Sequence, residues 1–184
     1  MSRQHATAVE PRSTVEDFLR HTADENPSLA RGLSVLDERG RRELGGVLGR
    51  LEPRSGGPLG ARERLLCRRI LLRVRKPSAA SFSLLNRALD YFDLDADGKL
   101  DEAELELGVR VLEVFARADS PNDTLSEKEL RMLYACLRHL DSNHDGRLTG
   151  EELRHLGEAV RDPDAFLAAQ RATNPRLREV LEGA

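Results

Sequence analysis

Two stretches of twelve residues share one pattern of oxygen-bearing side chains and glycine. One runs from Asp93 to Glu104 and the other from Asp141 to Glu152. In each stretch, positions 1, 3, 5, 9 and 12 carry a side-chain oxygen, position 6 is glycine and position 8 is leucine. Oxygen atoms at this close and regular spacing can surround a hard cation, which needs more of them than one side chain supplies. We therefore treat both stretches as candidate cation-binding loops.

The pattern resembles the Ca²⁺-binding loop of the EF-hand family. The resemblance implies a loop that curls around the ion, with a glycine of positive φ at position 6, a backbone carbonyl ligand at position 7 and a bidentate glutamate at position 12. It implies two Ca²⁺ per chain, with Mg²⁺ as a candidate competitor. The implied ligands of loop one are Asp93, Asp95, Asp97, the carbonyl of Lys99, Asp101 and Glu104, and those of loop two are Asp141, Asn143, Asp145, the carbonyl of Arg147, Thr149 and Glu152.

Helical patterns flank both candidate loops in the same register. Apolar residues recur at helical spacing before each loop: Leu85, Ala88, Leu89 and Phe92 before the first, and Leu133, Cys136, Leu137 and Leu140 before the second. Acidic, glycine-containing loops between helices are common and need not bind an ion, so a single match to this pattern can arise by chance. Two matches, each between helices in register, favour two binding loops.

The connection between the loops is long for a close pair of EF-hands. The loops begin 48 residues apart, at Asp93 and Asp141. The added residues predict a lengthened helix from Glu102 to about Ala118, a turn at 119–123, and a new helix with a capping box of Ser126 and Glu129. If the loops pair as family members usually do, Leu100 and Leu148 face each other across a short two-stranded contact.

The whole chain is predicted to be all-α. Leu, Ala, Arg and Glu dominate, and alternating runs of Val, Ile and Thr are few. We expect paired EF-hands with additional N-terminal helices and a short C-terminal helical segment. The expected regions are a disordered N-terminus at 1–12, a basic helical region at 13–77 packed on the pair, the EF-hand pair at 78–161, and the C-terminal segment at 162–184.

Charge divides the chain into two halves. Residues 1–80 hold 16 Lys and Arg against 10 Asp and Glu, whereas residues 81–184 hold 13 against 22. The two halves should therefore attract each other. Within the basic half, Ser13 and Glu16 form a predicted capping box, and both Gly40 and the segment 52–58 are expected to interrupt helices.

The ends of the chain share a faint repeat. Phe18, Leu19, Asn26, Pro27, Leu29 and Leu33 match Phe166, Leu167, Asn174, Pro175, Leu177 and Leu181 with identical gaps. Either the repeat is a duplicated helical hairpin, or the two segments independently use Asn-Pro to start a helix, followed by leucines at the common i, i+4 spacing.

The segment 61–76 is predicted to be a basic amphipathic helix. Leu66, Cys67, Ile70, Leu71 and Val74 form one face, and arginines cover much of the rest. It resembles the targets that EF-hand pairs bind, so it is a candidate ligand in cis; the alternative is an ordinary core helix. The two cysteines, Cys67 and Cys136, lack C-x-x-C spacing and are expected to be buried free thiols, although neighbouring arginines could lower the pKa of Cys67.

Several function classes are disfavoured. No phosphate loop, nucleophile elbow or zinc-enzyme motif occurs, so we expect no enzyme, and the net charge of −3 disfavours a nucleic-acid binder. Neither a signal-peptide pattern nor an apolar run long enough for a membrane span is present, so we expect a cytoplasmic protein. The expected function is a Ca²⁺-responsive regulator that engages a protein target; the alternative is a Ca²⁺ buffer or a fold completed by structural Ca²⁺.

Overall fold

The structure, a computed structural model, describes residues 11–53, 58–118 and 123–183. These residues form helices joined by loops, which confirms the predicted all-α class. The helices are α1 (Pro11–Glu25), α2 (Pro27–Ser34), α3 (Glu38–Arg50), α4 (Ala61–Arg73), α5 (Ala79–Asp90), α6 (Glu102–Ala118), α7 (Glu127–Leu140), α8 (Gly150–Arg161), α9 (Pro163–Thr173) and α10 (Pro175–Glu182). Among them, no helix combines the length and apolar character needed to cross a bilayer.

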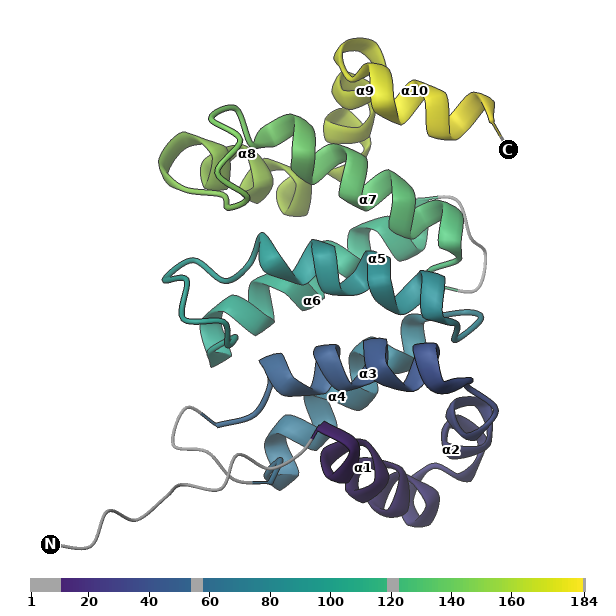
Figure 1. Ribbon diagram of the computed structural model, residues 1–184. Helices are drawn as coiled ribbons and strands as arrows, with labels where there is room; N and C mark the ends of the chain where they lie inside the picture. Colours follow the sequence, from purple (N-terminus) through teal and green to yellow (C-terminus); the bar gives the residue numbers. More distant parts are fainter. Residues whose placement is uncertain (1–10, 54–57, 119–122, 184) are drawn as a thin grey trace, which may run out of the picture.

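The helices are stacked in the order of the chain. Figure 1 shows α3, α5 and α7 side by side, with α1 beyond α3 at one end and α10 beyond α7 at the other. Contacts join α1 to α3, α3 to α5, α5 to α7, and α7 to α10. The N-terminal helices therefore lie directly against the hairpin that holds loop one.

One hydrophobic core runs through the stack. It includes residues from α1 to α10, with Phe18, Phe82, Phe92 and Phe115 among its largest fully buried side chains. Burying one such side chain contributes roughly 1.5–3 kcal/mol. Because this core is shared, the basic N-terminal helices and the candidate loops are parts of one packed structure.

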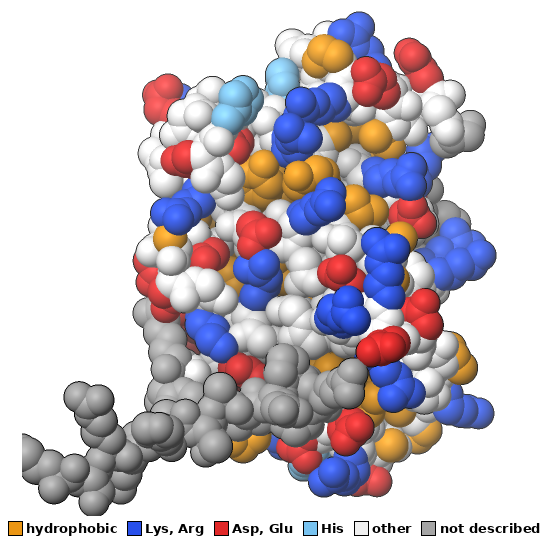
Figure 2. Space-filling model, in the orientation of Figure 1, with side chains coloured by type: hydrophobic (Ala, Val, Ile, Leu, Met, Phe, Trp, Pro, Cys, Tyr) orange, Lys and Arg blue, Asp and Glu red, His pale blue; other side chains and the backbone are white. Residues whose placement is uncertain are grey.

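Ion pairs connect the basic half to the acidic half. Arg62 on α4 pairs with Glu102 on α6, and Glu113 on α6 lies 3.2 Å from Arg73 and 3.6 Å from Arg69. On the face shown in Figure 2, side chains of both signs are interspersed, with hydrophobic side chains visible between them. Each half-exposed pair contributes little, on the order of 0–1 kcal/mol, so the shared core accounts for most of the association.

Two predicted boundaries in the N-terminal half were wrong. Helix α1 already begins at Pro11, since proline suits the first helical turn, and residues 1–10 of the predicted disordered end lie outside the described residues. Gly40 lies inside α3 instead of interrupting a helix. Asp37 caps this helix by accepting from the Gly40 N–H at 2.7 Å, and a Cβ on Gly40 would lie 2.9 Å from Leu36 Cδ2. The glycine therefore provides space for a close contact.

The amphipathic helix predicted over 61–76 ends earlier, at Arg73. There the backbone leaves the helix, and Val74 forms an isolated parallel bridge with Leu125. The Leu125 N–H donates to the Arg73 carbonyl at 2.5 Å, and the Arg75 N–H donates to the Leu125 carbonyl at 2.9 Å. Hydrogen bonds to the segment before α7 thus replace the last helical turn.

The connection between the two loops has the predicted helices. Helix α6 spans Glu102–Ala118, and α7 begins with the predicted capping box, in which the Ser126 N–H donates to Glu129 Oε2 at 2.8 Å and Ser126 Oγ accepts from the Lys128 N–H at 3.2 Å. Of the predicted turn at 119–123, only Asp123 belongs to the described residues.

The repeated segments at the two ends have the same local structure. Asn26 caps α2 by accepting from the Leu29 N–H at 3.0 Å, and Asn174 caps α10 by accepting from the Leu177 N–H at 3.2 Å. A proline follows each asparagine at the first helical position. Asn174 also donates to the Ala135 carbonyl at 3.0 Å, which fixes the C-terminal hairpin to α7.

Candidate metal centre

Both candidate loops hold their first carboxylate in the same way. In loop one, Asp93 accepts from the N–H groups of Asp97 and Gly98 at 3.2 and 2.9 Å. In loop two, Asp141 accepts from the N–H groups of Asp145 and Gly146 at 3.2 and 3.0 Å. Both carboxylates are buried. The two loops therefore curl to the same shape, with position 1 at the inside of the turn.

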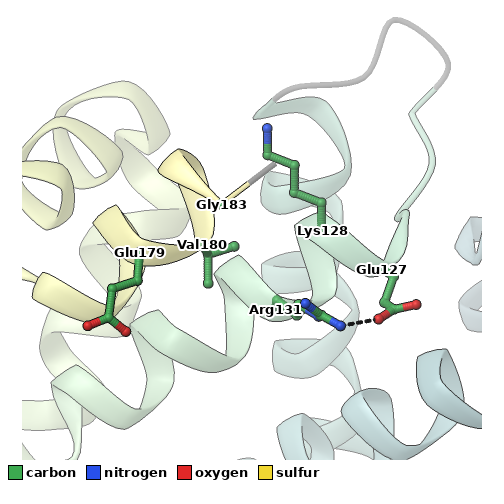
Figure 3. A pocket seen from close by; sticks show the side chains of 6 residues that line it. All are labelled: Glu127, Lys128, Arg131, Glu179, Val180 and Gly183. Atoms are coloured by element: carbon green, nitrogen blue, oxygen red, sulfur yellow. Dashed lines mark hydrogen bonds and ion pairs between the residues drawn. The ribbon is translucent and has the colours of Figure 1, made fainter.

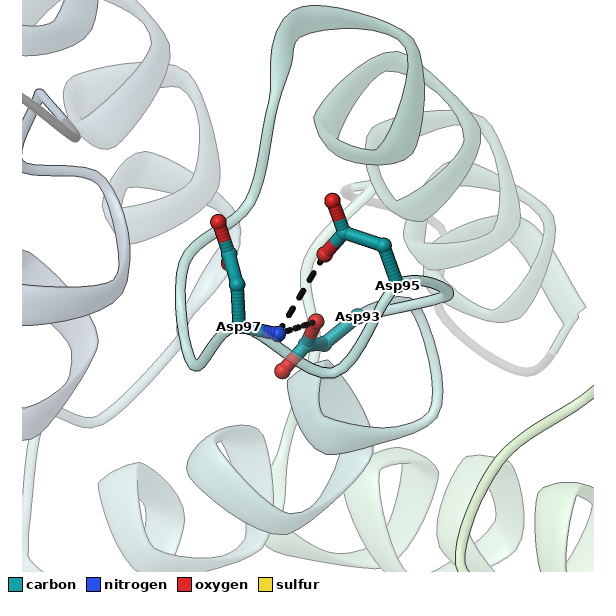
Figure 4. A group of neighbouring side chains, drawn as sticks. All are labelled: Asp93, Asp95 and Asp97. Atoms are coloured by element: carbon teal, nitrogen blue, oxygen red, sulfur yellow. Dashed lines mark hydrogen bonds between the residues drawn. The ribbon is translucent and has the colours of Figure 1, made fainter.

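The side chains at positions 3 and 5 converge on position 1. In loop one, carboxylate oxygens of Asp93, Asp95 and Asp97 lie within 4.8 Å of one another, and Figure 4 shows the Asp97 N–H between the carboxylates of the other two. In loop two, Asn143 accepts from the Asp145 N–H at 3.1 Å and donates to the Asp145 carboxylate at 3.0 Å. These donors are all oxygens, which fits Ca²⁺ or Mg²⁺ and not a softer metal.

The glutamate at position 12 folds back over each loop. Glu104 accepts from the N–H groups of Leu94 and Asp101, both at 2.8 Å. Glu152 makes the equivalent bonds to the N–H groups of Ser142 and Thr149, at 2.9 and 3.2 Å. The Ser142 hydroxyl also donates to Glu152 at 2.7 Å, and this bond is the main reason that the pKa of Glu152 lies below its usual range. Both glutamates are buried at the mouth of their loops.

Left-handed backbone conformations shape both turns. Gly98 and Gly146 have φ of 81° and 82°, as the sequence predicts for position 6. The position-4 residues Ala96 and His144 also have positive φ, of 62° and 59°. Residues with a Cβ adopt this conformation at a penalty of roughly 1–2 kcal/mol, so the surrounding hydrogen bonds must hold it. Neither alanine nor histidine at position 4 predicts this second left-handed conformation.

The remaining predicted ligands lie at positions 7 and 9. The N–H groups of Lys99 and Arg147 donate to the position-5 carboxylates of Asp97 and Asp145 at 2.8 and 2.9 Å. Ligation by their carbonyls stays a prediction. Asp101 accepts from the Glu104 N–H at 2.9 Å and thereby also caps α6. Thr149 occupies the corresponding position before α8.

The predicted contact between Leu100 and Leu148 was wrong. The described residues contain no bridge between these two leucines. Instead, the Leu100 N–H donates to the Arg50 carbonyl at the end of α3, at 2.7 Å. The stacking of α3 against α5 brings the end of α3 to loop one. The Leu100 N–H therefore bonds to α3 and not to loop two.

Lys99 strengthens the connection between loop one and the N-terminal helices. Its ammonium donates to the Gly49 carbonyl at 2.6 Å and lies 3.2 Å from the Glu52 carboxylate, which also accepts from Thr14 Oγ1 of α1 at 2.9 Å. A cation at the carboxyl end of a helix is favoured by the helix dipole. The predicted ligand at position 7 is only the backbone carbonyl, so the charged Lys99 side chain is free to serve as this anchor.

The comparisons with known proteins agree with this geometry. The EF-hand family model matches residues 85–109 and 133–156, which contain the two loops with parts of their flanking helices. These matches support the resemblance of both segments to EF-hands. Comparisons with curated proteins and with solved structures found no match.

A hollow of about 390 Å³ lies away from both loops, between α7 and α10. Its lining carries charges of both signs, and Figure 3 shows Arg131 donating to Glu127, at 2.5 Å. The residues that line it are Glu127, Lys128, Arg131, Glu179, Val180 and Gly183. None of them is a predicted ligand, so the hollow is separate from the cation sites.

The cysteines are buried free thiols, as predicted. The alternative of a reactive Cys67 was wrong: burial raises the pKa of Cys67 far above its usual range, and the neighbouring Arg68 opposes this only weakly. Burial likewise raises the pKa of Cys136, to about 12. Both thiols are therefore protonated and poor nucleophiles at neutral pH.

Proposed function

We propose that this protein is a Ca²⁺-responsive regulator that binds one Ca²⁺ in each loop. The support for two ions is that the two loops place oxygen-bearing side chains at the same positions and share the same hydrogen bonds to positions 1 and 12 and the same backbone turns. Mg²⁺ also prefers oxygen ligands, but it needs a tighter octahedral shell and is expected to compete weakly.

One observation carries the regulatory part of the proposal. The two successive residues Lys99 and Leu100 of loop one bond to the carboxyl end of α3, at Gly49 and Arg50. Arg50 also pairs with Asp90 at the end of α5, three residues before the first ligand. A change in loop one on ion binding therefore acts directly on α3, and through Glu52 on α1.

A buffer or structural role is the second candidate. The observation that favours it is the continuous core, which joins the N-terminal helices to both hairpins. A regulator would have to expose an apolar groove, and this would require separating helices that pack together in this core. Methionine, which is common in target-binding grooves, occurs only at Met1 and Met132.

The calcium response separates the two candidates. For a regulator, we expect Ca²⁺, but not Mg²⁺, to increase the binding of a hydrophobic dye and to change amide hydrogen exchange in residues 81–161 and in α3. Replacing Lys99 with methionine should reduce the response of α3, whereas the matched change Arg147→Met in loop two should leave it intact. Saturated sites with unchanged dye binding and unchanged exchange in α3 would rule out the regulator and leave the buffer.

The proposed partner is a protein target. Helix α4 of the same chain is the candidate that could bind in cis at the site where this target would bind. Burial of Cys67, Ile70 and Leu71 in the core supports the alternative that α4 is a fixed core helix. We favour this alternative, because releasing α4 would expose all three side chains to water.

Cys67 can report on α4 directly. In a Cys136→Ser variant, we expect the Cys67 thiol to resist a thiol reagent at neutral pH in both Ca²⁺ and a chelator, because it is buried and protonated. Denatured protein, in which the thiol is free, is the positive control. Fast labelling in Ca²⁺ alone would mean that α4 leaves the core and would favour the ligand in cis.

A further inference from the structure

Two of the three large hydrophobic side chains that are exposed in the described part of the chain lie on α4. Leu65 is 52% exposed and Leu72 is 51% exposed, whereas the third, Val35, lies at the end of α2. Seven residues make nearly two helical turns, so the two leucines lie on one face of α4. Arg62 and Arg69 share this face, because each lies three residues before a leucine. We call these four residues the α4 stripe.

The opposite side of the helix fixes the α4 stripe in place. Cys67, Ile70 and Leu71 lie on that side and are buried in the core. At the edge of the helix, Arg68 pairs with Glu25 of α1. The stripe is therefore presented by a packed helix and is already exposed. A partner can bind to it without any separation of the helices that pack in the core.

The surroundings of the α4 stripe carry a net positive charge. Glu113 on α6 lies 3.2 Å from Arg73 and 3.6 Å from Arg69, so one carboxylate faces two guanidinium groups. Arg75 and Lys76, directly after the helix, are exposed and add two further positive charges. A partner surface that complements this region has an apolar centre with acidic side chains around it.

One end of the α4 stripe reaches loop one. Arg62 pairs with Glu102, which is position 10 of that loop and directly follows the predicted ligand Asp101. Arg62 and Glu102 line a hollow of about 260 Å³ together with Lys99. A change in loop one on ion binding therefore acts on the Arg62 end of the stripe.

We propose that the α4 stripe is the docking surface for an acidic amphipathic helix of a protein partner. The proposal rests on the proposed function, because it names the partner of the proposed regulator. Apolar side chains of the partner helix cover Leu65 and Leu72, and its carboxylates pair with Arg69 and the basic residues nearby. The stripe spans only about three helical turns and buries less area than a permanent interface, so the complex is expected to be transient.

Two other occupants fit the charges less well. An anionic membrane would be repelled by Glu102 and Glu113, which lie beside the arginines of the stripe. A second copy of the chain, docked stripe to stripe, would bring the same arginines together. An acidic helix has neither disadvantage, since its carboxylates can bind the arginines that remain exposed.

A designed peptide tests the docking surface on the full chain. The probe is a synthetic helix of about twenty residues, with leucines along one face, glutamates beside them and alanines elsewhere. A scrambled peptide of the same composition is the control ligand. Fluorescence anisotropy of the labelled peptide should show saturable binding in Ca²⁺ that weakens as salt is added. The scrambled peptide should bind at least about tenfold more weakly.

Two variants of the stripe should each weaken binding of the probe at least about tenfold. The first combines Leu65→Ser with Leu72→Ser, which removes the apolar contact, and the second is Arg69→Glu, which reverses a charge. Val35→Ser and Arg154→Glu are the matched controls. They change an exposed hydrophobic side chain and an exposed, paired arginine away from α4, so binding should stay within about twofold.

Calorimetry with Ca²⁺ and urea unfolding accompany each variant. None of the substituted residues is a predicted ligand, so Ca²⁺ affinity should stay within about twofold of that of the unmodified chain. Because the substituted side chains are exposed, each variant should unfold in a transition close to that of the unmodified chain.

The outcomes separate the docking surface from the proposed function. Absence of probe binding, or binding that the stripe variants leave unchanged, would overturn the docking surface. Binding to phosphatidylserine vesicles in place of the probe, or a dimer of the chain that the stripe variants abolish, would overturn the proposed partner. Probe binding with equal affinity in Ca²⁺ and in a chelator would instead leave the surface standing and contradict the regulator.

Discussion

Replacing either closing glutamate with glutamine is expected to weaken Ca²⁺ binding at its own loop by at least about tenfold, or about 1.4 kcal/mol. Glu104 and Glu152 are the predicted bidentate ligands, and glutamine offers a single neutral oxygen in place of a charged pair. Each glutamate also holds two N–H groups of its loop, so the substitution weakens the closed shape of the loop too. Calorimetric titration should then show one strong site in each single variant and none in the double variant.

The control for this result comes from nearby glutamates that are not predicted ligands. Glu106 on α6 is exposed and pairs with Arg110, and Glu151 next to Glu152 pairs with Arg154. Glu106→Gln and Glu151→Gln remove the same charge without removing a predicted ligand, so both sites should stay within about twofold of their original affinity. Equal loss in ligand and control variants would mean that overall charge, not ligation, determines binding.

Replacing Phe92 with alanine is expected to reduce the free energy of unfolding by about 3–5 kcal/mol. The ring is fully buried, and it lies against the backbone of α6, where a Cβ on Gly108 would be 3.3 Å from Phe92 Cδ2. The surrounding helices α5 and α6 cannot close the cavity without moving the loop between them. Urea unfolding in a chelator measures this effect without the contribution of bound Ca²⁺ to stability.

Leu65→Ala is the matched control for the core variant. Leu65 is on α4 and is 52% exposed, so its truncation should change the free energy of unfolding by no more than about 0.5 kcal/mol. A similar loss in both variants would contradict the description of Phe92 as a core residue and of Leu65 as a surface residue.

The loops could be predicted from the sequence because their geometry is local. The turn at Gly98 and the capping role of Asp101 involve partners within a few residues, and the same holds for Gly146 in loop two. Residue type and spacing are then sufficient. Ser126 and Glu129 at the start of α7 were predictable for the same reason.

The contacts of loop one with the rest of the chain could not be predicted in this way. The Leu100 N–H bonds to Arg50 and the Lys99 ammonium to Gly49, about fifty residues earlier in the chain. These partners depend on how α3 stacks against α5, which helical periodicity does not specify. For the same reason the sequence predicted helix at Val74, where pairing with Leu125 ends α4.

The number of Ca²⁺ ions bound per chain tests the central claim most directly. Native mass spectrometry, combined with calorimetry of the unmodified chain, should find two Ca²⁺ per chain, with dissociation constants in the range of roughly 10⁻⁸ to 10⁻⁵ M. A chain that binds one ion, or none, would contradict the claim that both loops are calcium sites.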